Sequence, residues 1–226
     1  MNRNNSLSLI FAFIMSVAHA TCVRAQDSCG NCIKSNAEVS ADTTYTTLDE
    51  RMAMIDACID TSLRKLILPD DYDCLVMNRE KALDILSALD ATAYGIGERG
   101  MVRRMLTEQE MAVSSQELSA YRKVRSIQVN NSGIFSYPYF ACRFTRRDGR
   151  IFFEKTSGSQ RKSGFVYDNR PTSKLFLGGW SVNNDPQTAY GSENSQAGML
   201  YKTAADRLMM LFVVPGRSFE IYELKK

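Results

Sequence analysis

A polar run between two predicted strands carries the side chains best suited to bind a ligand. Donors and backbone amides that gather around glycines can form a concave anion site. The run lacks the glycine-lysine pattern and the following helix of a P-loop, and a plain polar β-turn is the alternative interpretation. Its candidate ligand-binding residues are Lys155, Thr156, Ser157, Ser159, Gln160 and Arg161.

A second polar loop, residues 183–195, is longer than a hairpin requires. Loops of this length in compact domains are often functional or disordered. Trp180, the single tryptophan of the chain, stands at the base of this loop and is the seventh candidate ligand-binding residue. We expect its ring to anchor the loop.

The only histidine, His19, lies within a predicted signal peptide. A mature chain would therefore contain no imidazole, which excludes Ser-His and Cys-His nucleophilic catalysis and histidine acid–base chemistry. The same absence excludes His-ligated zinc, copper and iron sites. We expect no metal and no cofactor, although a cysteine-only metal site is formally open.

Other catalytic motifs fit poorly. Ser62–Lys65, Ser181–Asn183 and Lys155–Ser157 approach the three elements of serine acyl-transferases, but their order along the chain is wrong. The carboxylates at Asp70, Asp71 and Asp73 match no complete calcium loop and are typical of a solvated turn. We therefore assign no catalytic residue.

Residues 1–25 have the pattern of a secretory signal peptide. A basic Arg3 precedes an apolar stretch at 7–17, which is too short to span a bilayer, and small residues offer cleavage after Ala20 or Ala25. We expect a periplasmic or secreted protein with no transmembrane span in its mature form.

Charge gives no support for nucleic-acid binding. Without Arg3 and Arg24, 26 basic residues face 25 acidic ones, so the net charge of the expected mature chain is close to zero. A nucleic-acid-binding domain normally shows a marked excess of basic residues.

The number of cysteines fits an exported protein, because disulfides form in oxidising compartments. We expect Cys29, Cys32, Cys58 and Cys74 to form disulfides that stabilise a small helical region. A redox role for the C-x-x-C pair is the alternative, but no strand precedes that pair as redox folds require. Cys142 is left as a possible free thiol.

The hydrophobic pattern divides the chain at residue 118. Residues 26–118 predict short helices: one capped by Thr47 and ended by Pro69, one capped by Asn78, and one near residues 98–111. Residues 119–226 predict short strands with turns between them, and a sheet of this size must close or fold over. The fold class is thus α+β, with a helical segment before an antiparallel β-barrel or curved β-sandwich. The predicted strands are 121–129, 137–145, 151–155, 164–167, 174–180, 198–202, 207–214 and 219–224.

An ordered series of motifs in the β-region resembles a known family. They are Tyr137–Arg143, Lys155–Arg161, Phe176–Gly179, Tyr190–Gly191, Ala197–Gly198 and Phe219–Leu224. Over about residues 120–226, the chain is similar to an uncharacterised family of bacterial exported proteins defined by a domain of unknown function. That resemblance implies export and a β-architecture. It also implies a cysteine on the preceding strand as the partner of Cys142, but Lys123 stands there instead.

These observations predict a non-enzymatic exported β-domain that binds a small ligand or a protein partner of the cell envelope. The alternatives are a histidine-independent enzyme that uses carboxylates and the Lys155–Arg161 loop on an envelope substrate, and a purely structural protein. A cavity inside the barrel would favour a ligand, and a filled barrel with an exposed aromatic patch would favour a protein. A cleft with paired carboxylates beside Lys155 and Arg161 would favour the enzyme.

Overall fold

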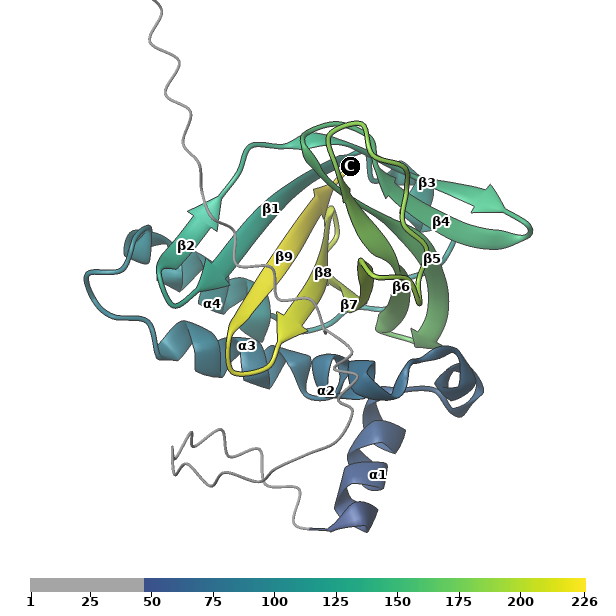
Figure 1. Ribbon diagram of the computed structural model, residues 1–226, viewed down its shortest axis with the longest axis horizontal. Coiled ribbons are helices and arrows are strands. Elements are labelled where there is room, and N and C mark those ends of the chain that lie inside the picture. Colours follow the sequence, from purple (N-terminus) through teal and green to yellow (C-terminus); the bar gives the residue numbers. More distant parts are fainter. Residues whose placement is uncertain (1–46) are drawn as a thin grey trace, which may run out of the picture.

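The computed structural model describes residues 47–226, in which a helical part precedes a sheet of nine antiparallel strands (Figure 1). The helical elements are α1 (Leu48–Cys58), η1 (Thr61–Leu66), η2 (Pro69–Asp71), α2 (Tyr72–Leu75), α3 (Asn78–Ser87), η3 (Ile96–Glu98), α4 (Arg99–Thr107) and η4 (Glu117–Ala120), where η marks a 3-10 helix. The strands are β1 (Lys123–Asn130), β2 (Gly133–Ser136), β3 (Phe140–Arg147), β4 (Arg150–Lys155), β5 (Gln160–Arg170), β6 (Ser173–Val182), β7 (Ser195–Ala204), β8 (Arg207–Val214) and β9 (Ser218–Lys225).

The sheet closes into a barrel. Strands β3 to β9 pair in sequence order, and β1 closes the ring because it pairs with β9 along its whole length and with β3 at its first two residues. Strand β2 pairs with the rest of that edge of β1 and is the one strand outside the ring. Of the two architectures expected from the sequence, the protein therefore has the barrel.

All eight predicted strands are present, and they are the eight strands of the ring. The prediction missed only β2, whose four residues are too few to show a clear alternation. The turn between β3 and β4 has positive φ at both Asp148 and Gly149, the conformation that a tight hairpin favours.

Aromatic side chains fill the barrel. The rings of Phe153, Phe176, Phe212 and Tyr222 pack edge to face, with centroids 5.5 Å apart for Phe176 and Phe212 and 6.3 Å apart for Phe153 and Tyr222. Such geometry adds to the stabilisation from burial. One end of the barrel is plugged by the segment before β1, in which Leu118 is fully buried.

The helices cover part of the outer wall. Side chains of α3, such as Ala82 and Leu86, join one buried cluster with outward-facing residues of β1 and β9, such as Ile127 and Ile221. In Figure 1 this helical layer lies along one side of the barrel. The outer face of β4 and the neighbouring part of β5 carry the candidate site. Farther along β5, Asn169 contacts the helical part through Cys58 and Asp60.

The predicted capping box at Thr47 is confirmed, because the Glu50 amide donates to Thr47 Oγ1 and the Thr47 amide donates to Glu50 Oε2. The prediction that one continuous helix runs from there to Pro69 is wrong, since α1 ends at Cys58. Asp60 accepts a hydrogen bond from the Ser62 amide at 2.9 Å and starts a separate 3-10 turn.

The predicted cap at Asn78 is also wrong. Met77, in a left-handed conformation, precedes α3, and Asn78 is its first residue. The Asn78 side chain instead accepts a 2.7 Å hydrogen bond from the Tyr201 hydroxyl and ties α3 to β7.

The predicted signal peptide lies outside the described residues. Within residues 47–226, no helix has the length and apolar character needed to cross a membrane.

Candidate functional site

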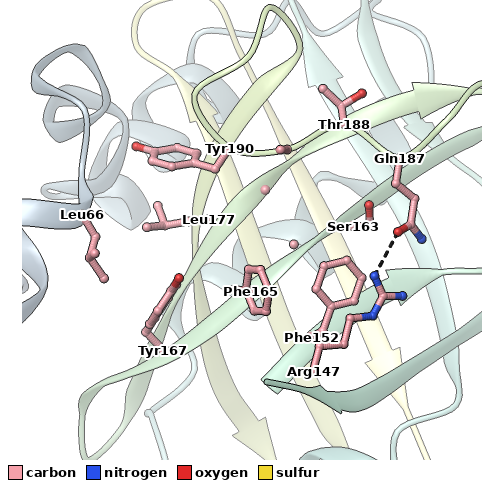
Figure 2. A pocket seen from close by; sticks show the side chains of 13 residues that line it. Leu66, Arg147, Phe152, Ser163, Phe165, Tyr167, Leu177, Gln187, Thr188 and Tyr190 are labelled. Atoms are coloured by element: carbon pink, nitrogen blue, oxygen red, sulfur yellow. Dashed lines mark hydrogen bonds between the residues drawn. The ribbon is translucent and has the colours of Figure 1, made fainter. Parts of the chain in front are cut away.

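A groove of about 320 Å³ lies on the outer face of β4, β5 and β6 (Figure 2). The loop between β6 and β7 forms one wall, and Leu66 of η1 lies at one end. Figure 2 shows Tyr190 and Gln187 extending from that loop over the groove.

Outward-facing aromatic side chains line the groove. Phe152 of β4 meets Phe165 of β5 edge to face, with centroids 5.2 Å apart, and Tyr167 lies 6.5 Å beyond Phe165. Alternation along β5 places Phe165 and Tyr167 on the same outer face. Gly164 and Gly178 also line the groove, where they add backbone and no side chain. The groove therefore suits a flat apolar group.

Tyr190 holds the loop wall against the helical part. Its hydroxyl donates to Asp71 and accepts a 2.9 Å hydrogen bond from the Leu68 amide. Burial and the Asp71 contact raise the pKa of Tyr190, so the phenol stays protonated and keeps its donor. Burial likewise raises the pKa of Asp71, although the hydrogen bond from Tyr190 opposes that shift.

Replacement of Tyr190 by phenylalanine is expected to lower the free energy of unfolding by about 1 kcal/mol, because the half-buried Asp71 and the Leu68 amide lose their partner. We also expect faster proteolysis within residues 183–195, measured by limited digestion and mass spectrometry. Tyr94→Phe is the matched control, since Tyr94 is 67% exposed. Equal digestion rates for Tyr190→Phe and the wild type would contradict this role of the hydroxyl.

The polar end of the groove has a net positive charge. Arg147 lies over the Phe152 ring, 3.5 Å from its centroid, and donates at 3.2 Å to both Gln187 and Glu154. Glu154 also accepts from Arg143 at 2.6 Å and from Gln187 at 2.7 Å. One carboxylate thus serves two guanidinium groups, which leaves an excess of one positive charge.

The charge state of Glu154 follows from the same contacts. Burial alone would raise the pKa of Glu154, but the hydrogen bonds and charges of Arg143, Gln187 and Arg147 outweigh burial and lower it. The carboxylate therefore remains ionised at neutral pH and holds both arginines in place.

The structure brings only some of the predicted ligand-binding residues together, since Lys155 donates to the Gln160 carbonyl at 2.7 Å while Arg161 makes its contact elsewhere. Lys155 points into the barrel, where its ammonium lies over the Phe140 and Tyr222 rings. Arg161 donates at 3.0 Å to the carbonyl of Asp185 in the β6–β7 loop. Lys155 and Arg161 therefore make separate contacts, and neither of them lines the groove.

The remaining predicted residues lie in the β4–β5 turn or at the end of the barrel. Ser157 Oγ accepts from the Ala141 amide at 2.8 Å, while Thr156 and Ser159 are exposed. Gln160 begins β5, and Trp180 of β6 is the partner of Lys162 across the β5–β6 pair. The polar-turn interpretation therefore fits Thr156, Ser157 and Ser159.

Sequence reasoning missed the groove residues themselves. It singled out the loop at 183–195 by length, and that loop does form a wall of the groove. It had no signal for Phe152, Phe165 or Tyr167, because aromatic residues on strands usually face a core.

The cysteines and potential metal ligands give no further site. Cys29 and Cys32 lie outside the described residues, and no disulfide joins Cys58 to Cys74, so disulfides of this region remain a prediction. Burial raises the pKa of the Cys142 thiol to about 12, which keeps it protonated and unreactive. No group of three or more His, Cys, Asp and Glu residues within 47–226 is placed to hold a metal ion.

Comparisons with known proteins give one family and one structural match. A family model described as a domain of unknown function (DUF4893) matches residues 70–224. A solved structure of a redesigned β-barrel is 14% identical in sequence, covers 52% of this chain and 98% of its own, and has a TM-score of 0.35. No curated protein matches the chain.

Proposed function

Because the chain belongs to the family described as a domain of unknown function (DUF4893), a description that gives no activity, we propose from the groove itself that the protein binds a small amphipathic ligand. The ligand has a flat apolar body and an acidic group. The observation that carries this proposal is an aromatic groove of about 320 Å³ with Arg147 at one end.

The barrel is filled, but the outward-facing aromatic side chains line a groove of about 320 Å³, so size and chemistry support a small molecule over a protein partner. Ligand sites are typically apolar clefts of about 300–1,000 Å³ with a few polar groups that fix orientation. Phe152, Phe165 and Tyr167 supply the apolar surface, and Arg147 and Gln187 supply the polar groups. An acidic group would meet the excess positive charge that the two arginines leave beside Glu154.

The binding test uses anilinonaphthalene sulfonate, a fluorescent probe with an aromatic body and one negative charge. Arg147→Ala is expected to weaken its binding about tenfold, because a charge-assisted hydrogen bond is lost. Ala189→Trp is expected to abolish binding, since Ala189 lines the groove and a tryptophan there would fill it. Probe fluorescence is titrated against folded protein, and folding is checked by urea unfolding.

Two matched variants control for general effects of charge and size. Arg146→Ala removes the same charge from the neighbouring, exposed position, and Ala205→Trp adds the same ring at an exposed turn. Both are expected to bind the probe as the wild type does. Binding that is unaffected by Arg147→Ala and Ala189→Trp would reject the groove as the site.

A further inference from the structure

The end of the barrel opposite the plug holds two buried lysines. Lys155 of β4 and Lys162 of β5 are each only 6% exposed. The segment that ends at Tyr121 plugs the opposite end. The lysines lie instead at the end reached by the β4–β5 turn and the β6–β7 loop, which meet where the Asn183 amide donates to the Ser159 carbonyl at 2.7 Å.

One carboxylate, that of Glu220, lies near the two lysines, and of the two it pairs with Lys162 alone. Lys162 pairs with Glu220 of β9 at 2.9 Å and also donates to Gln196. Lys155 donates at 2.7 Å to the main-chain carbonyl of Gln160. An ammonium has three donors, and the other two of Lys155 have no oxygen partner among residues 47–226. This end of the barrel thus contains one more positive than negative charge.

Aromatic rings and amides surround the lysines. Lys155 lies 4.5 Å from the Phe140 centroid and 5.7 Å from that of Tyr222, and Lys162 lies 5.6 Å from the same Tyr222 centroid. Both ammonium groups therefore face one ring. Gln128 donates at 3.0 Å to the side chain of Gln160, so two side-chain amides line the same end. Cation–π contacts offset only part of the cost of burying an ammonium.

Burial lowers the pKa of Lys155, the charge of Lys162 lowers it further, and Glu220 opposes both effects. An apolar residue of similar volume would fit the aromatic surroundings at a lower cost in stability. A buried charge that is kept at such a cost is a candidate for a functional role.

We propose that Lys155 and Lys162 bind an oxyanion, a carboxylate or a phosphate group, at the end of the barrel opposite the plug. The anion would take the two spare donors of Lys155 and balance the excess positive charge. Because these side chains point inward and the aromatic groove lies on the outer face of the barrel, this site is separate from that groove.

Inorganic phosphate and acetate serve as probes, each titrated into the full chain against sodium chloride at equal ionic strength. Trp180 is a natural reporter, since it is the single tryptophan and pairs with Lys162 across β5 and β6. Phosphate or acetate is expected to change its fluorescence saturably and to raise the melting temperature. The probe that binds more tightly identifies the chemical group.

Lys155→Met is expected to raise the half-saturating concentration at least tenfold while the free protein is as stable as the wild type or more so. Lys123→Met, at an exposed strand position, is the matched control and keeps wild-type binding. Lys155→Arg, which keeps the charge, is expected to retain the response. A merely structural lysine would give a less stable variant with unchanged binding.

The proposal is overturned if neither anion gives a response beyond that of chloride, or if folded Lys155→Met binds within twofold of the wild type. Should Lys155→Met fail to fold, wild-type protein labelled with carbon-13 at lysine Cε provides the second measurement. The anion must then shift two lysine signals selectively, and an unchanged spectrum also overturns the proposal.

Discussion

Gly178→Ala is expected to lower the free energy of unfolding by about 3 kcal/mol, the upper end of the usual cost of overpacking. A Cβ atom at Gly178 would lie 2.1 Å from the Ser163 carbonyl oxygen and 2.6 Å from the Gly164 Cα. Both are backbone atoms of the paired strand β5 and cannot rotate aside as the end of a side chain would. The two strands would have to separate beneath the groove.

Urea unfolding followed by circular dichroism measures this effect. Gly100→Ala, within α4, is the matched control, because its Cβ would meet only the end of the Arg104 side chain at 4.0 Å. We expect this control to raise stability by about 0.5–1 kcal/mol, since alanine is the better helix former. Equal unfolding midpoints for Gly178→Ala and the wild type would mean that β5 and β6 do not approach so closely. Loss of probe binding in Gly178→Ala is also expected, because the groove lies on these strands.

The barrel strands could be predicted from sequence because each one combines a β-rich run with turn residues at its end. Pro215–Gly216 separates β8 from β9, and Gly216 has a φ of 67°, which glycine adopts without strain. Closure into a ring could not be derived in the same way. It depends on the pairing of β1 with β9, whose residues lie far apart in the chain.

The charged end of the barrel shows why the site was harder to predict. Lys155 and Lys162 look like members of a polar loop, because surface lysines and buried lysines have the same sequence signature. Their inward direction follows only from the register of β4 and β5, and β5 begins at Gln160, inside the predicted loop. The groove residues were hard to predict for the same reason. Phe152 faces outward and Phe153 faces the core, and two consecutive phenylalanines do not show in the sequence which of them faces which way.

Glu220→Gln is expected to lower the free energy of unfolding by about 3 kcal/mol at neutral pH, because it leaves the buried ammonium of Lys162 without its carboxylate. The two side chains are 16% and 7% exposed, and the Glu220 carboxylate also accepts hydrogen bonds from Ser126 and Gln128. Glu193→Gln, in the exposed β6–β7 loop, removes the same charge and is expected to change stability by less than about 0.5 kcal/mol.

Low pH should remove the stabilisation that the Glu220 carboxylate gives to the wild-type protein. Burial alone would raise the pKa of Glu220, but Lys162 and the hydrogen bonds outweigh burial, so its folded-state pKa lies below the ordinary value of 4.5. A group with a lowered pKa stabilises the fold fully above its unfolded-state pKa and loses that effect as pH falls through the folded-state pKa. The difference in unfolding free energy between the wild type and Glu220→Gln should thus be constant above about pH 5.5 and shrink below about pH 4.5. A difference that stays constant down to pH 3 would show that this carboxylate gains nothing from Lys162, and the charge count at the barrel end would then need revision.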